Sequence, residues 1–457
     1  MLKCPQSHGS SSHVINTHLT LFAILQIQTM VFAIIYYTFV LLFAGLTYAS
    51  VEGRIPVVPR LQYLVVLGLS LISEWPLPVI VLKIVLIIIA SMLGVFKGII
   101  PQLFYIVDIL NMIGLVVIFI DADEARRAIE QAIKSYSDQR ELPTFTSETF
   151  WQRMANPRFV PQNVFQYADI SYANHSEKSE AMKESFEQVN YLTLDVYARK
   201  DISRSAPKPV FMYIHGGEWI RGDKASPYPL IRHLAEVGWV VVSINYRLAP
   251  TSSYPSQLID AKRALRWVKQ NIEHFGGDPK FIAVAGDDAG GQIAAVLALT
   301  PNKQEYQPGF GDVDTSVKAC VLINAITDLA DEQNSWISDY FSKKIAGRQT
   351  KDIPLLKEHS PLHLIKDDSV PFLVFHGDRD TSVPFKSSSI FVDEFKKKCK
   401  AEIQFIPIPG GHHVYNLFSS PRSHYQAIGV EQWLNHIHSE EGNGDYAWVS
   451  KENDFSD

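Results

Sequence analysis

The residues with the clearest chemical potential surround a carboxylate in a glycine-rich turn. The sequence reads Gly286-Asp287-Asp288-Ala289-Gly290-Gly291; an apolar run of strand length precedes it and an Ala/Leu-rich stretch of helical character follows it. A strand-turn-helix junction of this kind presents its central side chain, here Asp288, at the end of a strand. A carboxylate held there can attack an electrophilic carbon and form a covalent ester.

Three further motifs supply partners for this chemistry. His215-Gly216-Gly217 follows an apolar run, and the backbone N–H groups of Gly216, Gly217 and Ala289 are expected to stabilise an oxyanion. Asp380 and His412 follow two later apolar runs. In chain order, Asp288, Asp380 and His412 predict a nucleophile, an acid that orients the histidine, and a histidine that activates water. Adjacent His413 is the substitute for His412, and each polar residue has a structural interpretation as a loop or capping residue.

The elements that must position these residues alternate along the chain after residue 190. Strands are expected over 191–198, 210–214, 239–245, 281–285, 319–325, 372–375 and 403–408. Helices are expected over 228–237, 257–275, 289–299, 387–398 and 422–438. This alternation predicts an α/β fold with a mostly parallel sheet covered on both faces. Because the carboxyl ends of parallel strands converge, the distant motifs can meet there.

The first part of the chain has a different composition. Residues 18–120 are dominated by Leu, Ile, Val and Phe, and stretches 19–49, 77–96 and 99–120 are long enough to cross a hydrocarbon core of roughly 30 Å. Stretch 61–73 is a shorter candidate. A cleavable signal peptide is disfavoured because the first stretch is too long and further spans follow. Lys83 can extend its ammonium group toward the membrane interface, and Asp108 can pair with Lys83 or with a helix end, which disfavours a transport pathway.

These patterns predict the following organisation. Residues 1–120 form a membrane segment with three to four transmembrane helices, which makes the lipid bilayer a partner and the protein a multi-pass membrane protein, expected in the endoplasmic reticulum. Residues 121–190 form an amphipathic connector and a cap segment. Residues 191–440 form the catalytic domain with a cap insertion at 326–368, and residues 441–457 a disordered tail.

Charge, cysteine and histidine usage exclude several function classes. The net charge is −6 and no basic run occurs, which argues against a nucleic-acid partner. The three cysteines form no motif, and His412 and His413 are adjacent without the spacing of metal ligands. No cofactor and no metal are therefore expected.

The motifs resemble those of the hormone-sensitive-lipase-like branch of α/β hydrolases. The resemblance covers about residues 191–438 and rests on His215-Gly216-Gly217, Asn245-Tyr246-Arg247-Leu248-Ala249-Pro250, Gly286 to Gly291, Asp380 and His412. Membrane-anchored mycobacterial esterases are similar through Gly276-Gly277-Asp278-Pro279 and Leu299-Thr300-Pro301-Asn302. The resemblance implies an α/β-hydrolase fold with a catalytic triad, in which family members have serine at the position of Asp288.

The carboxylate changes the expected reaction. Attack on an ester carbonyl would form a mixed anhydride that mostly reverts, whereas attack on an epoxide carbon gives an alkyl ester that water can hydrolyse. Epoxide hydrolases and haloalkane dehalogenases use such aspartates, but dehalogenases commonly carry Trp after the nucleophile, where this chain has Ala289. Epoxide opening needs an acid for the departing oxygen, and Tyr246, Tyr340 and Tyr415 are the candidate substrate-binding residues.

The chain is also similar to membrane-anchored fungal epoxide hydrolases of polyketide biosynthesis, which belong to secondary metabolism. That resemblance implies a lipophilic, polyketide-like substrate and an upstream flavin monooxygenase as a pathway partner. Two alternatives stay open. One is a carboxylesterase in which His412 activates water directly; the other is an inactive binding module, although loss of activity gives no reason for Asp380 and His412 to be kept.

Overall fold

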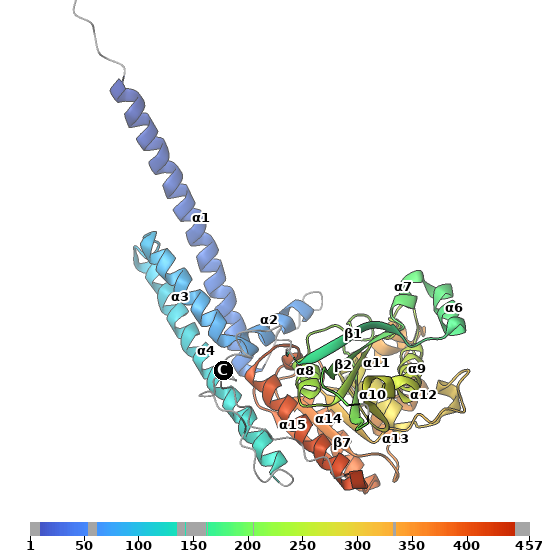
Figure 1. Ribbon diagram of the computed structural model, residues 1–457. Helices are drawn as coiled ribbons and strands as arrows, with labels where there is room; N and C mark the ends of the chain where they lie inside the picture. Colours follow the sequence, from blue (N-terminus) through green and yellow to red (C-terminus); the bar gives the residue numbers. More distant parts are fainter. Residues whose placement is uncertain are drawn as a thin grey trace, which may run out of the picture. The chain divides into compact units, whose positions relative to one another are not determined.

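The computed structural model of the protein describes residues 10–53, 62–134, 142, 161, 163–203, 205–331 and 335–443. The chain divides into two compact units, Met1–Ile120 and Asp121–Asp457 (Figure 1). The predicted tail lies outside the described residues from residue 444 onward, as does most of the segment between 135 and 162.

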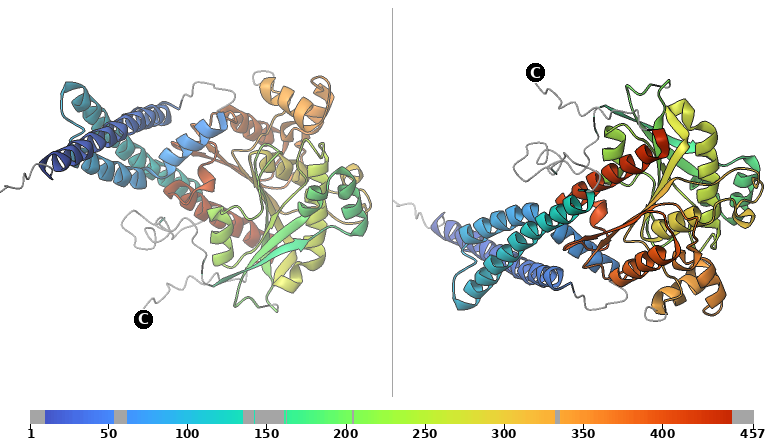
Figure 2. Two further views of the ribbon diagram at one scale, coloured as in Figure 1. Left: turned by 90° about the horizontal axis from the view of Figure 1, so that it is seen from above. Right: turned by 90° about the horizontal axis from the view of Figure 1, so that it is seen from below.

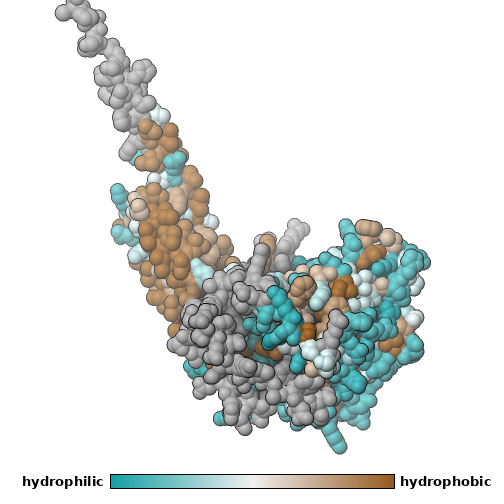
Figure 3. All heavy atoms as spheres, in the orientation of Figure 1, coloured by the Kyte–Doolittle hydropathy of each residue, from teal (hydrophilic) through white to brown (hydrophobic). Residues whose placement is uncertain are grey.

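The first unit consists of apolar helices. They are α1 (Ser10–Glu52), α2 (Gln62–Glu74), α3 (Pro76–Met92) and the first part of α4 (Ile99–Ile133). By length and composition, the Ala23–Glu52 part of α1 and α4 could each cross a membrane, and α2 and α3 could form one broken span with a 90° bend. Apolar side chains cover much of the visible surface of these helices (Figure 3). The described residues thus contain two helices that could cross a membrane, or three with the bent pair, whereas the sequence predicted three to four.

The two charged residues within the expected spans contact each other. Lys83 on α3 forms an ion pair with Asp108 on α4, and both side chains are only 1% exposed. The hydroxyl of Tyr36 on α1 donates a hydrogen bond to Asp108 at 2.7 Å. The expected pairing is therefore present, and it compensates two charges that would be costly if buried alone.

The second unit is built on one eight-stranded sheet with the order β1-β2-β4-β3-β5-β6-β7-β8. Its strands are β1 (Val164–Ser171), β2 (Thr193–Arg199), β3 (Lys208–Ile214), β4 (Val240–Ile244), β5 (Gly277–Asp287), β6 (Ala319–Ile323), β7 (Phe372–Gly377) and β8 (Ile403–Ile408). Strand β2 runs antiparallel to β1 and β4, and the remaining pairs are parallel. The mostly parallel sheet predicted from the sequence is confirmed.

Helices cover both faces of this sheet (Figure 2). The helices α8 (Pro229–Glu236), α15 (Pro421–His438) and the end of α4 pack on one face, and α9 (Ser256–Asn271), α10 (Asp288–Leu299) and α14 (Phe385–Lys398) pack on the other. In the predicted connector, Ala125, Ile129 and Ile133 recur at helical spacing and are fully or almost fully buried. The connector is therefore amphipathic, and its apolar stripe covers part of the sheet.

Shorter helices occupy the two segments that were expected to form a cap. The first contains α6 (His175–Glu184) and α7 (Phe186–Asn190); the second contains α11 (Ser335–Tyr340), η3 (Phe341–Ile345), α12 (Ile353–Glu358) and α13 (Pro361–Leu364). The remaining single turns are η1 (Ile272–Phe275), η2 (Gln304–Tyr306), η4 (Tyr415–Leu417) and η5 (Ser439–Asn443). Buried Arg247 forms two hydrogen bonds with Asp260 on α9, at 2.8 and 3.0 Å, and pairs with Glu184 on α6. The motif around Arg247 thus holds the first cap segment on the sheet's covering helices.

Candidate active site

The turn at Asp288 has the geometry expected of a nucleophile elbow. Strand β5 ends at Asp287, helix α10 begins at Asp288, and Asp288 has a φ of 49°, which is rare for a residue with a side chain. A Cβ on Gly286 would lie 2.3 Å from the carbonyl oxygen of Gly290, and one on Gly290 would lie 2.2 Å from that of Ile214. A side chain would clash at either position, so only glycine fits there. The glycines let the strand and the helix approach closely, and the short turn between them holds Asp288 in its left-handed conformation.

Two backbone N–H groups donate to one oxygen of the Asp288 carboxylate. Oδ2 accepts from Gly217 at 3.0 Å and from Glu218 at 2.9 Å. The N–H of Gly216 instead donates to Asp287 Oδ1 at 2.8 Å, so the structure corrects the predicted oxyanion group at this position. Ala289, which directly follows Asp288, is buried, and the oxyanion-stabilising role of its N–H remains a prediction. The role of Glu218 was not predictable from residue types, because a backbone N–H can come from any residue except proline.

The histidine beside the two carboxylates is His413. Its Nδ1 lies 2.7 Å from Asp380 Oδ2, and its Nε2 lies 3.6 Å from Asp288 Oδ1. The prediction of His412 was therefore wrong by one residue. The His412 ring is buried, and its Nε2 has no hydrogen-bond partner within the described part of the chain. Burial and the positive charges of Arg422 and Arg379 lower its pKa to about 4, so His412 is a neutral interior residue.

Asp380 lies where the sequence placed it. Besides His413, its carboxylate accepts backbone hydrogen bonds from Ser382 at 2.8 Å and Val383 at 2.9 Å, and His376 Nε2 lies 3.3 Å away. Burial by itself would raise the pKa of Asp380, but the charge of His413 and the hydrogen bond from His376 outweigh it and hold the pKa below its usual range. Asp380 therefore stays ionised and orients His413.

The charges at the site reinforce one another. Burial would raise the pKa of Asp288, but His413 and the N–H groups of Glu218 and Gly217 hold it below its ordinary value. Burial likewise would lower the pKa of His413, but the charge of Asp380, its hydrogen bond and the nearby Asp288 carboxylate raise the pKa instead. The resting site therefore contains an Asp288 carboxylate and a His413 imidazolium.

Asp287 is a second buried carboxylate in the elbow. Its Oδ1 accepts from the Tyr213 hydroxyl and the Gly216 N–H, each at 2.8 Å, and its Oδ2 accepts from the Tyr228 hydroxyl at 3.3 Å. Burial raises the pKa of Asp287 to about 6 even though these hydrogen bonds oppose the shift. By fixing Gly216, Asp287 directs the next two N–H groups of the loop toward Asp288.

The three candidate tyrosines have different surroundings. The Tyr246 hydroxyl donates to the His215 carbonyl at 2.9 Å and its ring stacks on His215, so Tyr246 supports the loop. Tyr415 is fully buried in the core on the α15 face. Tyr340 suits the predicted role best, because burial and the nearby charge of Glu218 raise its pKa, with a smaller contribution from the charge of Asp288.

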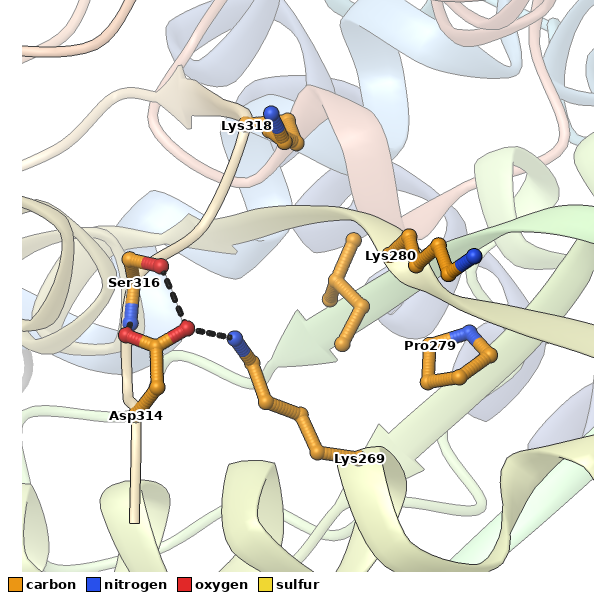
Figure 4. Close-up of a pocket in the computed structure, with 7 residues that line it drawn as sticks. Lys269, Pro279, Lys280, Asp314, Ser316 and Lys318 are labelled. Carbon is orange, nitrogen blue, oxygen red and sulfur yellow. Dashed lines mark hydrogen bonds and ion pairs between the residues drawn. The ribbon is translucent and has the colours of Figure 1, made fainter. Parts of the chain in front are cut away.

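A pocket of about 470 Å³ lies away from this site, at the edge where β5 begins (Figure 4). Its lining includes Lys269, Lys280 and Lys318. Lys269 pairs with Asp314 at 2.7 Å and Lys318 with Glu441 at 2.6 Å, so two of the three ammonium groups are already compensated. Among the described residues, no group of three His, Cys, Asp or Glu side chains could hold a metal ion.

Comparisons with known proteins agree with this architecture. The family described as BD-FAE matches residues 194–395. Solved esterase B from Lactobacillus rhamnosis superposes with a TM-score of 0.52 at 21% identity, covering 70% of this chain and 98% of that one. The second unit has the α/β-hydrolase fold.

Two curated proteins of Mycobacterium tuberculosis are similar to part of this chain. A probable carboxylic ester hydrolase, LipM, is 37% identical over 251 residues, which are 54% of this chain and 58% of LipM. Esterase LipQ is 34% identical over 249 residues, which are 54% of this chain and 59% of LipQ. The chain therefore matches somewhat more than half the length of each relative.

Proposed function

We propose that the α/β-hydrolase unit is a hydrolase that opens an epoxide of a lipophilic substrate through a covalent ester on Asp288. The observation that carries the proposal is the unequal environment of the two Asp288 oxygens. Oδ2 is held by the N–H groups of Gly217 and Glu218, whereas Oδ1 lies on the side of His413. One oxygen is thus prepared to become a carbonyl oxygen, and the other is free to attack carbon.

In the first step, Asp288 Oδ1 forms a bond to an epoxide carbon while the bond from that carbon to the ring oxygen breaks. The Tyr340 hydroxyl can donate a hydrogen bond to the departing oxygen. The proton comes from His413, because esterification removes the Asp288 charge that contributed to raising its pKa. The products of this step are a hydroxyalkyl ester on Asp288 and a neutral His413.

In the second step, neutral His413 accepts a proton from water, and the hydroxide adds to the ester carbonyl carbon. The negative charge that develops on Oδ2 is stabilised by the N–H groups of Gly217 and Glu218. The tetrahedral intermediate then expels the alkoxide, which takes the proton of the newly formed carboxylic acid. A diol leaves, and the Asp288 carboxylate and His413 imidazolium are regenerated.

The apolar helices of the first unit support the rest of the proposal. Helices that cross a membrane, such as that of the endoplasmic reticulum, would hold the enzyme at the bilayer into which lipophilic, polyketide-like compounds partition. An epoxide must be supplied by an oxygenase, and a flavin monooxygenase is the class proposed as the upstream partner.

A carboxylesterase is the second candidate, and the names of the relatives favour it over epoxide opening. In that case His413 would activate water and Asp288 would act only through its charge. The geometry opposes this mechanism, because an Asp288 oxygen already accepts from both N–H groups that a substrate carbonyl would need. The carbonyl oxygen of a substrate ester would have to displace the Asp288 carboxylate from these N–H groups.

Direct assays separate the two candidates. Purified full-length protein in detergent is incubated with a long-chain terminal epoxide and, separately, with a p-nitrophenyl ester, and intact and peptide masses are recorded after rapid acid quench. The proposal predicts diol formation and a mass increase on the peptide that contains Asp288. Ester hydrolysis with no epoxide consumption and no adduct would establish the carboxylesterase instead.

A further inference from the structure

The segment that follows β6 contacts all three loops of the candidate triad. The Ile326 N–H points to the Asp288 carbonyl at 3.5 Å, and a Cβ on Gly291 of α10 would lie only 2.5 Å from the Ala325 Cβ. Asn324 begins this segment, is fully buried, and binds the loops that carry Asp380 and His413. Segment 324–326 is therefore a common support for nucleophile, acid and histidine.

The Asn324 side chain bridges the acid and histidine loops by backbone hydrogen bonds. Its Oδ1 accepts from the Gly377 N–H at 2.8 Å, and Gly377 in turn accepts from the Asp380 N–H at 3.2 Å. Its Nδ2 donates to the His413 carbonyl through a short hydrogen bond and lies 3.4 Å from the His412 carbonyl. Only one orientation of the amide satisfies these partners, with the carbonyl toward the N–H and the amino group toward the two carbonyls.

Asparagine is suited to this position for two reasons. Its φ is 45°, a left-handed value that asparagine adopts more readily than most residues with a side chain. The two loops are also in close contact, because a Cβ on Gly377 would lie 2.3 Å from the Gly411 carbonyl oxygen. A side chain of another shape or without both a donor and an acceptor could not make the same bridge.

We infer that Asn324 is a positioning residue that sets the place of the His413 ring between Asp380 and Asp288. It acts through the backbone of the two loops, since its hydrogen bonds go to Gly377, His412 and His413 main-chain atoms. The inference rests on the proposed function only in using His413 as the base. It applies equally to epoxide and ester hydrolysis.

The chain offers a matched control. Asn302 also has a left-handed φ, 58°, and its side chain accepts a hydrogen bond from the Thr315 N–H at 2.7 Å, in the loop after the far end of α10. Glycine tolerates both backbone conformations. Asn324→Gly and Asn302→Gly therefore each remove an amide side chain that binds a neighbouring loop, buried at Asn324 and exposed at Asn302, while the local backbone geometry is kept.

The test measures kcat, KM and the pH dependence of kcat for full-length variants, with whichever probe the wild type hydrolyses, a terminal epoxide or a p-nitrophenyl ester. Asn324→Gly should lower kcat by about tenfold to a hundredfold with little change in KM, the scale expected for misplacing a catalytic group by roughly 1 Å. Its pH profile should shift as His413 loosens from Asp380. Asn302→Gly should match the wild type in both properties.

Asn324→Asp covers the case in which Asn324→Gly does not fold, since it keeps the shape and the acceptor for Gly377 but loses the donor to His413. A wild-type kcat and pH profile in Asn324→Gly, or in Asn324→Asp when the glycine variant does not fold, would overturn the inference, as would an equal loss in Asn302→Gly. Failure of the proposed function is distinguishable: it would appear as full activity in Asp288→Ala, whatever the Asn324 variants do.

Discussion

His413 Nε2 lies 3.6 Å from Asp288 Oδ1, on the opposite side of the carboxylate from the two N–H groups that hold Oδ2. This separation is longer than a hydrogen bond and is typical of an ion pair. Where the resembled family has a serine hydroxyl, this elbow has a carboxylate. One oxygen of Asp288 forms an ion pair with His413, and the other is held by two backbone N–H groups. The chemistry that follows depends on which oxygen reacts.

The two adjacent histidines should have separable roles. His413→Ala should block hydrolysis of the ester while alkylation continues slowly, because Tyr340 and solvent can still protonate the departing oxygen. The Asp288 adduct should then accumulate and be visible in the intact mass. His412→Ala should turn over without accumulation. Accumulation of the adduct in His412→Ala and not in His413→Ala would mean that His412 is the histidine that activates water.

Asp288→Ser restores the glycine-flanked serine of the resembled family beside His413 and Asp380. Epoxide hydrolysis should vanish, because a serine that opened the ring would form an ether that water cannot cleave. The same variant should gain weak hydrolysis of short p-nitrophenyl esters, since the N–H groups of Gly217 and Glu218 would be released to bind a substrate carbonyl. Retained epoxide turnover in this variant would mean that Asp288 is not the nucleophile.

Tyr340→Phe should slow the alkylation step, because it removes the hydroxyl that is proposed to donate a hydrogen bond to the departing oxygen. General acid groups contribute roughly 10²-fold to 10⁴-fold, so a loss at or somewhat below the lower figure is expected if His413 supplies the proton. Single-turnover epoxide consumption measures the step. Tyr415→Phe, in the core on the α15 face, is the comparison and should alkylate normally; equal rates in both variants would remove Tyr340 from the mechanism.

The pH dependence of alkylation follows from the two opposite pKa shifts. The reactive pair is the Asp288 carboxylate, whose pKa is lowered, and the His413 imidazolium, whose pKa is raised. The rate should therefore stay level across the range in which a free histidine titrates, and should fall as the pH rises through the raised pKa of His413. Rapid-quench measurements of the alkylation rate across this pH range test whether the rate falls as the pH rises. A rate that increases with pH near the ordinary histidine pKa would show that neutral His413 is needed first.

Sequence patterns were sufficient for the elements with strong local signals. The run before Asp288 and the glycines after it predict β5 and α10 because an apolar strand, a tight turn and a helix each require characteristic residues there. Strand β1 was missed for the opposite reason. Residues 165–169 are exposed on both faces of an edge strand, and the register shifts between Tyr167 and Ile170, so no apolar alternation marks it.

The fine geometry of the site could not come from residue types. His412 and His413 are chemically identical, and the backbone path of their loop decides which ring faces Asp380. The contribution of Glu218 is a backbone N–H that carries no sequence signal. The sequence could not distinguish Tyr246 and Tyr415 from Tyr340, because all three carry the same phenol. Only the tertiary packing shows that Tyr246 supports a loop and that Tyr415 lies in the core.

A single turnover in H₂¹⁸O, with enzyme in excess over epoxide, shows whether an Asp288 oxygen or water attacks the epoxide carbon. If Asp288 Oδ1 attacks carbon, that oxygen leaves in the diol and water oxygen replaces it in the carboxylate. We therefore expect an unlabelled diol after one turnover and ¹⁸O in the peptide that contains Asp288. Label in the diol at the first turnover, with an unlabelled Asp288 peptide, would show that water attacks the epoxide directly and that Asp288 is not the nucleophile.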